Sequence, residues 1–406
     1  MSVFIHNFAV GGRAFARSIP GKDRLSARKT EKGFTMAGIY IHIPFCKSKC
    51  YYCDFYSCTM LARKDEVLAA IGDELAVRAG FLGGETVRTV YFGGGTPSLL
   101  APEDFAGLLG RIASVYDTAL DEVTAEVNPD DVSAAYLRSL RAAGVDRLSI
   151  GIQSFIDRDL KRMHRRHDAA AGEQAVRAAR TAGFSNLTID LIYGMPGMSL
   201  AEWESNLHRA VALGVPHISA YHLTVEERTV FGRRASRGEL REVAPAQSEE
   251  QYAALCRILS GAGYRHYEIS NFARPGYEAV HNGNYWNGTP YLGVGPSAHS
   301  FDGRRREWNV ADTVRYLSGA ARTDGETISA DTAYNEFVMT SLRTARGLDA
   351  DCLEGRFGAR KLQYFTARAA RLVEAGVLER EQSVYRIPES RFLVSDAVIS
   401  DLFYVG

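Results

Sequence analysis

The sequence has 406 residues, enough for one large domain and a smaller one. Apolar residues make up 46% of it and charged residues 24%, which is ordinary for a soluble globular protein. Because 48 basic residues balance 48 acidic ones, no overall field favours nucleic acid or an acidic membrane as a partner, and no apolar run reaches the roughly 18 residues of a membrane span. Six cysteines, three of them in one short stretch, indicate a reducing cytoplasm and argue against a disulfide framework.

Residues 1–35 differ from the rest of the chain. Basic side chains between Arg13 and Lys32 outnumber the acidic ones, and no hydrophobic core of a secretory signal is present. A transit peptide is one interpretation. We favour an upstream start codon, with Met36 as the initiator directly before the first predicted strand. Both interpretations predict disorder for residues 1–35.

Strands and helices alternate from Ile39 onward, and their hydrophobic runs end at glycine or proline. The predicted strands cover residues 39–43, 87–92, 122–127, 147–152, 186–193 and 217–223. The predicted helices cover residues 64–82, 102–116, 132–144, a segment that ends near Gly183, and 200–213. These strand–helix units predict an α/β fold, in which a parallel sheet with helices outside curls into a complete or partial TIM-type (β/α)6 barrel.

Three cysteines follow the first predicted strand, at Cys46, Cys50 and Cys53. They make poor disulfide partners because they are close in sequence and odd in number. They can converge on one metal centre. Iron–sulfur cubanes are normally held by four cysteine thiolates, so three local ligands would leave one iron open to an exchangeable ligand. The alternative is a zinc site that Cys58 or a distant histidine completes.

Polar residues and glycines also follow the other predicted strands. Residues 93–97 (Gly-Gly-Gly-Thr-Pro) come after the second strand, Glu126 ends the third, Gln153 follows the fourth, and Asp190 lies late in the fifth. Taken singly, Glu126 is most simply a surface or ion-pair carboxylate and Asp190 a satisfied core acid. Parallel barrels place their chemistry at the carboxyl ends of the strands, and several unpaired buried polar groups would be costly. The sequence therefore predicts a site at this rim.

Residues 331–406 predict a small separate domain after a barrel at 36–270 and a connecting region at 271–330. Residues 335–342 and 361–375 are typical of helices, and residues 384–393 alternate around Pro388 like the wing of a winged-helix module. A DNA-binding face would rest on Arg343, Arg346, Arg356 and Arg360, which are few, and the balanced charge argues against nucleic acid. We expect a lid or docking domain over the barrel mouth.

The cysteine stretch resembles the cluster loop of the radical S-adenosylmethionine (SAM) superfamily. The C-x3-C-x2-C spacing follows a strand directly, with Tyr40 upstream of it and Tyr52 just before the last cysteine. More narrowly, Tyr-Ile-His-Ile-Pro-Phe-Cys followed by Cys-Asp-Phe is similar to the HemW-type haem chaperones, relatives of the oxygen-independent coproporphyrinogen III oxidases (dehydrogenases). The run from His281 to Trp286 matches the His-Asn-x-x-Tyr-Trp signature of that type. The resemblance covers roughly residues 36–405, including the C-terminal domain.

The resemblance implies a 4Fe-4S cluster held by the three cysteines, and S-adenosylmethionine chelating the remaining iron through its amine and carboxylate. The implied contacts of this cofactor are Tyr40, Tyr52, Gly94, Gly95, Thr96, Glu126, Gln153, Arg165 and Asp190. Arg165 can fork onto a carboxylate, while Glu126 and Asp190 can accept from amine or ribose hydroxyl groups. The glycine run lacks the Gly-Lys-Ser/Thr ending of a phosphate loop, and we expect its glycines to let the backbone approach the ligand.

A second implied site is haem, at His281, Asn282, Tyr285 and Trp286. A neutral imidazole is a suitable axial ligand for haem iron, and Tyr285 and Trp286 offer flat apolar surface for a porphyrin. His299 is a second, weaker histidine candidate. The alternative is that this aromatic-rich segment packs locally.

Two functions are compatible with the resemblance. One is a cytoplasmic haem chaperone that hands haem to acceptor proteins and takes electrons for its cluster from a donor. The other is an oxygen-independent coproporphyrinogen III dehydrogenase, an enzyme of porphyrin biosynthesis that uses a deoxyadenosyl radical to decarboxylate propionate side chains. The dehydrogenases carry an extra cysteine two positions after the third ligand, where this chain has Phe55. That difference and the His-Asn-x-x-Tyr-Trp run favour the chaperone, with Cys58 as a bystander.

Overall fold

The structure, a computed structural model, describes residues 36–319 and 323–405. The interpretations given above for residues 1–35 lie outside the described residues. No helix in the described part of the chain combines the length and apolar character that crossing a bilayer requires.

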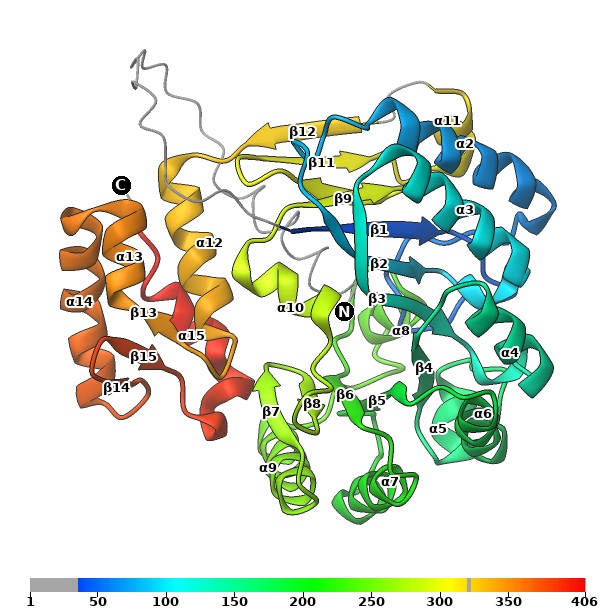
Figure 1. Cartoon of the computed structure of the whole chain (residues 1–406). Helices are drawn as coiled ribbons and strands as arrows, with labels where there is room; N and C mark the ends of the chain where they lie inside the picture. Colours follow the sequence, from blue (N-terminus) through cyan, green and yellow to red (C-terminus); the bar gives the residue numbers. More distant parts are fainter. Residues whose placement is uncertain (1–35, 320–322, 406) are drawn as a thin grey trace.

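Six parallel strands curve around the centre of the main domain and confirm the predicted α/β fold (Figure 1). They are β1 (Ala37–Ile43), β2 (Val87–Gly94), β3 (Thr118–Val127), β4 (Arg147–Gln153), β5 (Asn186–Tyr193) and β6 (His217–His222). Each pairs in parallel with the next strand along the chain. The barrel is partial, because β1 and β6 do not pair with each other in the described sheet but continue it in opposite directions. All seven residues of β1 are buried, as expected for a parallel strand covered on both faces.

Helices cover the outer face of these strands (Figure 1). They are α2 (Lys64–Val77), α3 (Pro102–Val115), α4 (Ala134–Ala142), α5 (Asp157–Arg162), α6 (Ala169–Thr181), α7 (Leu200–Ala212) and α9 (Pro245–Gly261). Helix α8 (Val230–Ser236) lies beside the cysteine loop instead, where the Phe231 amide donates to the Tyr51 carbonyl. Short 3-10 turns are η2 (Leu61–Arg63), η3 (Pro97–Leu99) and η4 (Pro129–Asp131). Helix α2 ends at Val77, before the predicted end of 64–82, and the turns that follow it run through Gly83 and Gly84, both at positive φ. Helix α7 begins with a capping box in which Ser199 and Glu202 satisfy each other's backbone N–H groups.

The region 271–330, treated above as a connecting region, supplies strands to the same sheet. Strand β7 (Arg265–Glu268) comes just before the region. The region itself contains β8 (Asn271–Ala273), α10 (Val280–Asn287), β9 (Tyr291–Val294), β10 (His299–Phe301), β11 (Arg305–Asn309), α11 (Thr313–Leu317) and β12 (Thr323–Thr327). Strand β9 pairs in parallel with β1, and β8 pairs antiparallel with β6. The segment therefore extends both edges of the barrel sheet.

The C-terminal domain combines helices with a separate three-stranded sheet in the order β13-β15-β14. Its elements are α12 (Ala330–Leu342), β13 (Leu348–Asp349), α13 (Ala350–Phe357), α14 (Ala359–Glu374), β14 (Glu379–Glu381), β15 (Val384–Arg386), η5 (Glu389–Val394) and α15 (Ser395–Ser400). Of the wing predicted at 384–393, only residues 384–386 form a strand. The β14–β15 hairpin stops at Arg386, because Pro388 has no N–H for the ladder, and a 3-10 helix follows.

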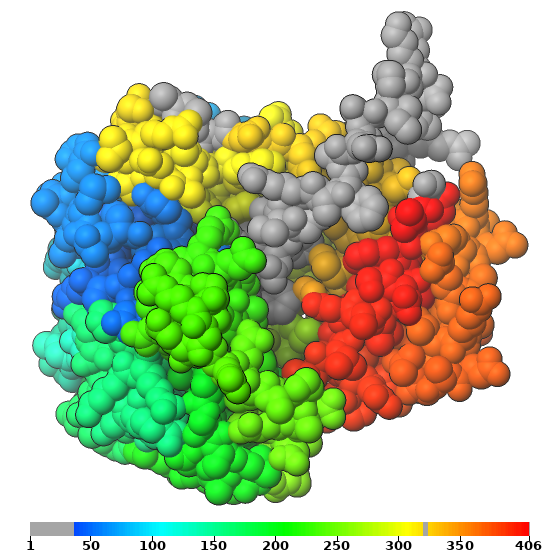
Figure 2. Space-filling model, turned by 180° about the vertical axis from the view of Figure 1, so that it is seen from behind, coloured from blue at the N-terminus to red at the C-terminus, as the bar shows by residue number. Residues whose placement is uncertain are grey.

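This domain is joined to the barrel by contacts between η5 and α9. The Tyr252 hydroxyl on α9 donates to the Glu389 backbone oxygen at 2.8 Å. In Figure 2 the red C-terminal residues lie between the orange helices of their own domain and the green residues of the barrel. The predicted docking of this domain against the barrel is thus seen in the structure.

Candidate functional site

A cavity of about 480 Å³ opens at the carboxyl ends of the barrel strands. It is lined by most of the predicted site residues: Cys46, Cys50, Tyr52, Cys53, Gly94, Gly95, Thr96, Glu126, Gln153, Arg165, Asp190 and Asn282. The C-terminal domain supplies part of the wall through Arg343, Phe392, Leu393 and Asp396. The tertiary structure therefore brings the rim residues of different strands to one cavity, and the C-terminal domain forms part of its wall.

The cysteine loop is closed at its base by backbone pairing. The Cys46 amide donates to the Cys58 carbonyl at 2.9 Å, and the Cys58 amide donates to the Pro44 carbonyl at 2.7 Å. This pairing holds the two ends of the loop together while its three cysteines line the cavity. The Cys58 sulfur lies 3.7 Å from the Thr313 hydroxyl and is not among the cavity atoms, in keeping with a bystander role for its thiol.

The separation of the three cysteine sulfurs bears on the alternative of a single zinc ion. Thiolates on one tetrahedral zinc lie about 3.8 Å apart, given Zn–S bonds of about 2.3 Å. Among the described residues, the sulfurs of Cys46, Cys50 and Cys53 do not form a group within 4.8 Å of one another. All three are free thiols, and burial raises the pKa of Cys53 to about 12, so binding iron must release its proton.

Arg165 links the loop to the barrel rim. Its Nη2 donates to the Asn128 side-chain oxygen and to the Gly151 carbonyl, both at 2.7 Å, and its Nη1 lies 3.5 Å from the Cys50 sulfur. Asn128 in turn donates to Thr96 at 3.3 Å, and the Thr96 hydroxyl donates to the Cys46 sulfur at 3.4 Å. The Nε–H group of Arg165 is buried without a hydrogen-bond partner among the described residues, so the guanidinium keeps capacity for a further acceptor.

The glycine run lines the cavity and also makes room for other parts of the protein. A Cβ atom on Gly95 would lie 2.6 Å from the Phe45 carbonyl oxygen, and one on Gly94 would lie 2.6 Å from the His42 ring. Gly94 also has φ +110°, a conformation that favours glycine. The missing side chains therefore admit the end of β1 and the start of the cysteine loop. Gly94 thus lies against a side chain of β1, and Gly95 lies against the backbone that leads into the cysteine loop.

Two partly buried carboxylates, Glu126 and Asp190, line the cavity from the ends of β3 and β5. Glu126 accepts from the Tyr91 hydroxyl at 2.9 Å and from the Gly94 amide at 3.2 Å. Asp190 accepts from the Ser149 hydroxyl, with a shortest distance of 3.0 Å. Burial raises the pKa of both carboxyl groups, because removal from water disfavours the charged form. Both can accept hydrogen bonds from a cationic or hydroxylated ligand in the cavity.

Gln153, at the end of β4, has φ +67°, which is uncommon for a residue with a side chain. The register between β4 and β5 shifts just before it, so the strand end is distorted where it meets the cavity. Tyr40 is placed differently from the other predicted contacts. It is buried behind the cavity wall, where its ring stacks on Tyr91 at 6.0 Å, and it does not line the cavity.

The His281 side chain lies in the core and does not reach the cavity surface. Its Nδ1 lies 2.8 Å from the Thr89 hydroxyl and its Nε2 lies 3.0 Å from the Tyr285 hydroxyl. Burial, with the nearby Arg147 charge, lowers the pKa of His281 to about 3. Glu122 fixes the helix by accepting from the backbone amides of Val280 and His281, at 2.9 Å and 3.0 Å. In this conformation both ring nitrogens of His281 are already used.

The other predicted haem contacts divide between core and cavity. Asn282 lines the cavity, and its side-chain oxygen is buried without a hydrogen-bond partner in the described part of the chain. Tyr285 packs edge-on against Tyr291 at 4.8 Å, and Trp286 is half-buried. His299 is buried on β10. The structure thus brings Asn282, and not the aromatic residues, to the predicted SAM contacts.

Several cavity residues were not predicted. Tyr91 lies on β2 and bonds to the predicted Glu126. Asn128 follows β3 directly and bonds to the predicted Arg165, and Ser149 lies on β4 and bonds to the predicted Asp190. Asn128 carried a usable signal, since it is polar and ends a barrel strand. No signal in the sequence pointed to Arg343 and Phe392 as cavity residues. They lie in the C-terminal domain, and no local sequence pattern shows how that domain docks on the barrel.

Two family models match the chain. The one described as "Radical SAM superfamily" matches residues 40–210, and the one described as "HemN C-terminal domain" matches residues 328–390. The first covers the cysteine loop and most of the barrel strands, and the second covers most of the C-terminal domain.

Curated and solved proteins match over most of the chain. A Mycobacterium tuberculosis protein named "Heme chaperone HemW" is 37% identical over 375 residues, which are 90% of this chain and 94% of the relative. The Bacillus subtilis protein of the same name is 33% identical and covers 88% of this chain and 97% of the relative. A solved structure described as "Coproporphyrinogen III oxidase (HemN) from Escherichia coli is a Radical SAM enzyme" is 25% identical, with a TM-score of 0.78 and coverage of 91% of this chain and 90% of that one.

Proposed function

Because the chain belongs to the HemW family of the radical SAM superfamily, we propose that it is a haem chaperone that binds haem and transfers it to acceptor proteins. The observation that carries the proposal is a likeness to named haem chaperones that runs through nearly the whole chain, including the barrel and the C-terminal domain. Free cysteines in the described residues agree with action in the reducing cytoplasm.

In this proposal Cys46, Cys50 and Cys53 hold a 4Fe-4S cluster at the cavity. When bound, the cluster and S-adenosylmethionine supply one-electron chemistry, with the electron coming from a donor protein. The protein's own contribution is positional. Thr96 and Arg165 contact two of the sulfurs, and the backbone pairing of Cys46 with Cys58 fixes the loop. Such contacts orient metal ligands and tune a cluster.

S-adenosylmethionine is proposed to occupy the cavity beside the cysteines. The unpartnered Nε–H of Arg165 supports binding of its carboxylate. Glu126 and Asp190 are proposed to accept from its amine or ribose hydroxyls, and Tyr52, Gln153, Thr96 and the two glycines form the surrounding wall. Tyr40 acts from behind this wall, since its ring packs on Tyr91, which donates to Glu126.

Haem is proposed to bind at His281, Asn282, Tyr285 and Trp286, in a state that differs from the one described. For His281 to ligate iron through Nε2, the ring must first lose its hydrogen bond to Tyr285. The Tyr285 hydroxyl therefore competes with haem for the imidazole.

We expect Tyr285→Phe to tighten haem binding about fivefold, because a net hydrogen bond of about 1 kcal/mol no longer opposes ligation. His281→Ala should weaken haem binding and change the absorbance spectrum of the bound haem. The measurement is haem titration of the intact protein by absorbance, with His299→Ala as the comparison for the second histidine. If affinity and spectrum are the same in wild type, His281→Ala and Tyr285→Phe, His281 is not part of the haem site.

The structural likeness to coproporphyrinogen III oxidase makes that activity the competing function. Phe55 lines the cavity at the position where those enzymes carry a further cysteine. We expect no product when cluster-loaded protein is incubated anaerobically with coproporphyrinogen III, S-adenosylmethionine and a reductant, with an authentic dehydrogenase run in parallel. Appearance of protoporphyrinogen at the rate of that enzyme would replace the chaperone assignment with the enzymatic one.

A further inference from the structure

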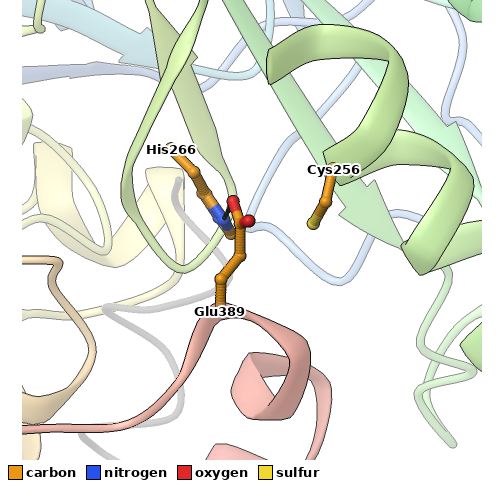
Figure 3. A group of neighbouring side chains, drawn as sticks. All are labelled: Cys256, His266 and Glu389. Atoms are coloured by element: carbon orange, nitrogen blue, oxygen red, sulfur yellow. Dashed lines mark hydrogen bonds and ion pairs between the residues drawn. The ribbon is translucent and has the colours of Figure 1, made fainter. Parts of the chain in front are cut away.

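Three side chains with metal-binding atoms meet where the C-terminal domain joins the barrel, outside the cysteine loop. Cys256 lies on α9, His266 on β7, and Glu389 at the first residue of η5 (Figure 3). One sulfur, one ring nitrogen and one carboxylate oxygen from these residues all lie within 4.8 Å of one another. Three separate elements, from two domains, therefore contribute to one small cluster.

The cluster has bonding capacity that the described residues leave unused. The His266 Nδ1 and a Glu389 carboxylate oxygen are 3.0 Å apart. The His266 side chain is only 3% exposed, and its Nε2 is buried with no hydrogen-bond partner among the described residues. Cys256 is a half-buried free thiol, whereas the Glu389 side chain is 47% exposed. A ligand can therefore reach the cluster from solvent along the Glu389 side.

Aromatic packing holds the imidazole in place. The His266 ring stacks on Phe272 at 4.0 Å with an interplanar angle of 10°, and Phe392 lies against it at 5.1 Å. The Tyr252 hydroxyl fixes the backbone of Glu389 by donating to its main-chain carbonyl at 2.8 Å. A site whose ligands are already oriented loses less entropy on binding than a flexible one.

We propose that Cys256, His266 and Glu389 bind a divalent metal ion of the zinc type, with the fourth position taken by water. Thiolate, imidazole and carboxylate together are a donor set that zinc accepts, at bond lengths of about 2.0 to 2.3 Å. Those lengths place neighbouring ligand atoms about 3.3 to 3.8 Å apart, so only small side-chain rotations are needed to close the present arrangement. Binding releases the thiol proton to solvent, leaves the ring proton of His266 on Nε2, and replaces the contact between His266 Nδ1 and Glu389 by two metal bonds.

A metal in this position fastens the C-terminal domain to the barrel beside the cofactor cavity. Phe392 and Leu393, in the same 3-10 helix as Glu389, line that cavity, and so does Tyr252. The bound ion thus holds one wall of the cavity closed, and its loss frees that wall. This inference does not depend on the haem-chaperone assignment, because it concerns only the junction between the domains.

The test uses the full-length, cluster-loaded protein dialysed anaerobically against zinc, with metal content measured by elemental analysis. We expect one zinc per chain beyond the iron, with one sulfur neighbour in the zinc X-ray absorption spectrum. Cys256→Ser should weaken zinc binding at least tenfold, and Glu389→Gln should weaken it about tenfold. Cys352→Ser is the matched control, because Cys352 is an exposed cysteine elsewhere in the same protein, and its zinc binding should not change.

Two results would overturn the proposal. One is wild-type protein that takes up no zinc beyond its iron sites. The other is a zinc affinity in Glu389→Gln equal to that of wild type. The second variant keeps the test decisive if Cys256→Ser does not fold, since the Glu389 side chain is about half exposed and its replacement leaves the core intact.

Discussion

Replacing any one of Cys46, Cys50 and Cys53 by serine is expected to reduce the iron and acid-labile sulfide recovered after anaerobic reconstitution from about four of each per chain to less than about one. Each of these cysteines lines the cavity, and each would hold a different iron of the cluster. With only three protein ligands present, the loss of one leaves two thiolates, which is too few to retain a cubane. The measurement is iron and sulfide content, together with the visible absorbance of the cluster.

Cys58→Ser is the control for this prediction. Cys58 belongs to the same segment and pairs through its backbone with Cys46, yet its thiol lies outside the cavity beside Thr313. The serine variant keeps that backbone pairing, so it should retain the full cluster. A wild-type protein that contains zinc and neither iron nor sulfide would contradict the cluster assignment, and so would an equal loss of iron in Cys58→Ser and Cys53→Ser.

Asp190→Asn is expected to weaken S-adenosylmethionine binding by about 10- to 100-fold while the fold keeps or gains stability. A hydrogen bond to a charged group contributes about 1.5 to 3 kcal/mol, which corresponds to this range of affinity. The hydroxyl of Ser149, which now donates to Asp190, can rotate and accept from an asparagine instead. The substitution therefore removes the charge while the Ser149 hydroxyl keeps a hydrogen-bond partner.

The pH dependence follows from the raised pKa of Asp190, which has burial as its main cause. A carboxyl group whose pKa is higher in the folded state stabilises the fold below its unfolded pKa, and that contribution is lost as the pH rises through the folded pKa. Asparagine does not titrate, so the Asp190→Asn variant does not lose this stability as the pH rises. The difference in the free energy of unfolding between variant and wild type should therefore grow from acidic to neutral pH. The affinity of the wild type for S-adenosylmethionine should change in the opposite direction. It should fall as the pH falls, because binding needs the ionised carboxylate of Asp190.

The measurements are anaerobic calorimetric titration of the cluster-loaded protein with S-adenosylmethionine, and denaturant unfolding, each at several pH values. Ser114→Ala serves as a control, because Ser114 is exposed on α3 and its hydroxyl donates to the Arg111 carbonyl in the same helix. An unchanged affinity in Asp190→Asn would exclude this carboxylate from the cofactor site. Equal pH slopes in wild type and variant would assign the titration to another group, such as Glu126, whose pKa is also raised by burial.

The sequence alone determined the barrel and the residues at its rim. Strand β5 spans Asn186–Tyr193, as predicted, and the other barrel strands differ from their predicted ranges by a few residues at their ends. These elements were predictable because hydrophobic runs and the glycines or prolines that end them are local in sequence. The rim residues followed from one general property of parallel barrels, that the carboxyl ends of the strands face the same side.

Only the tertiary structure decided how those elements are used. His281 fits a haem ligand by its type and motif, yet Thr89 and Tyr285 occupy both of its nitrogens in the core. Gly94 and Gly95 are explained by the approach of β1 and the cysteine loop, which lie far from them in sequence.

The pairing of β9 with β1 and the wall formed by the C-terminal domain likewise join residues that no local pattern relates. A sequence pattern records which face of an element is apolar or polar. It does not record which distant element covers that face, and that covering element decides whether a polar side chain is satisfied in the core or left available to a ligand.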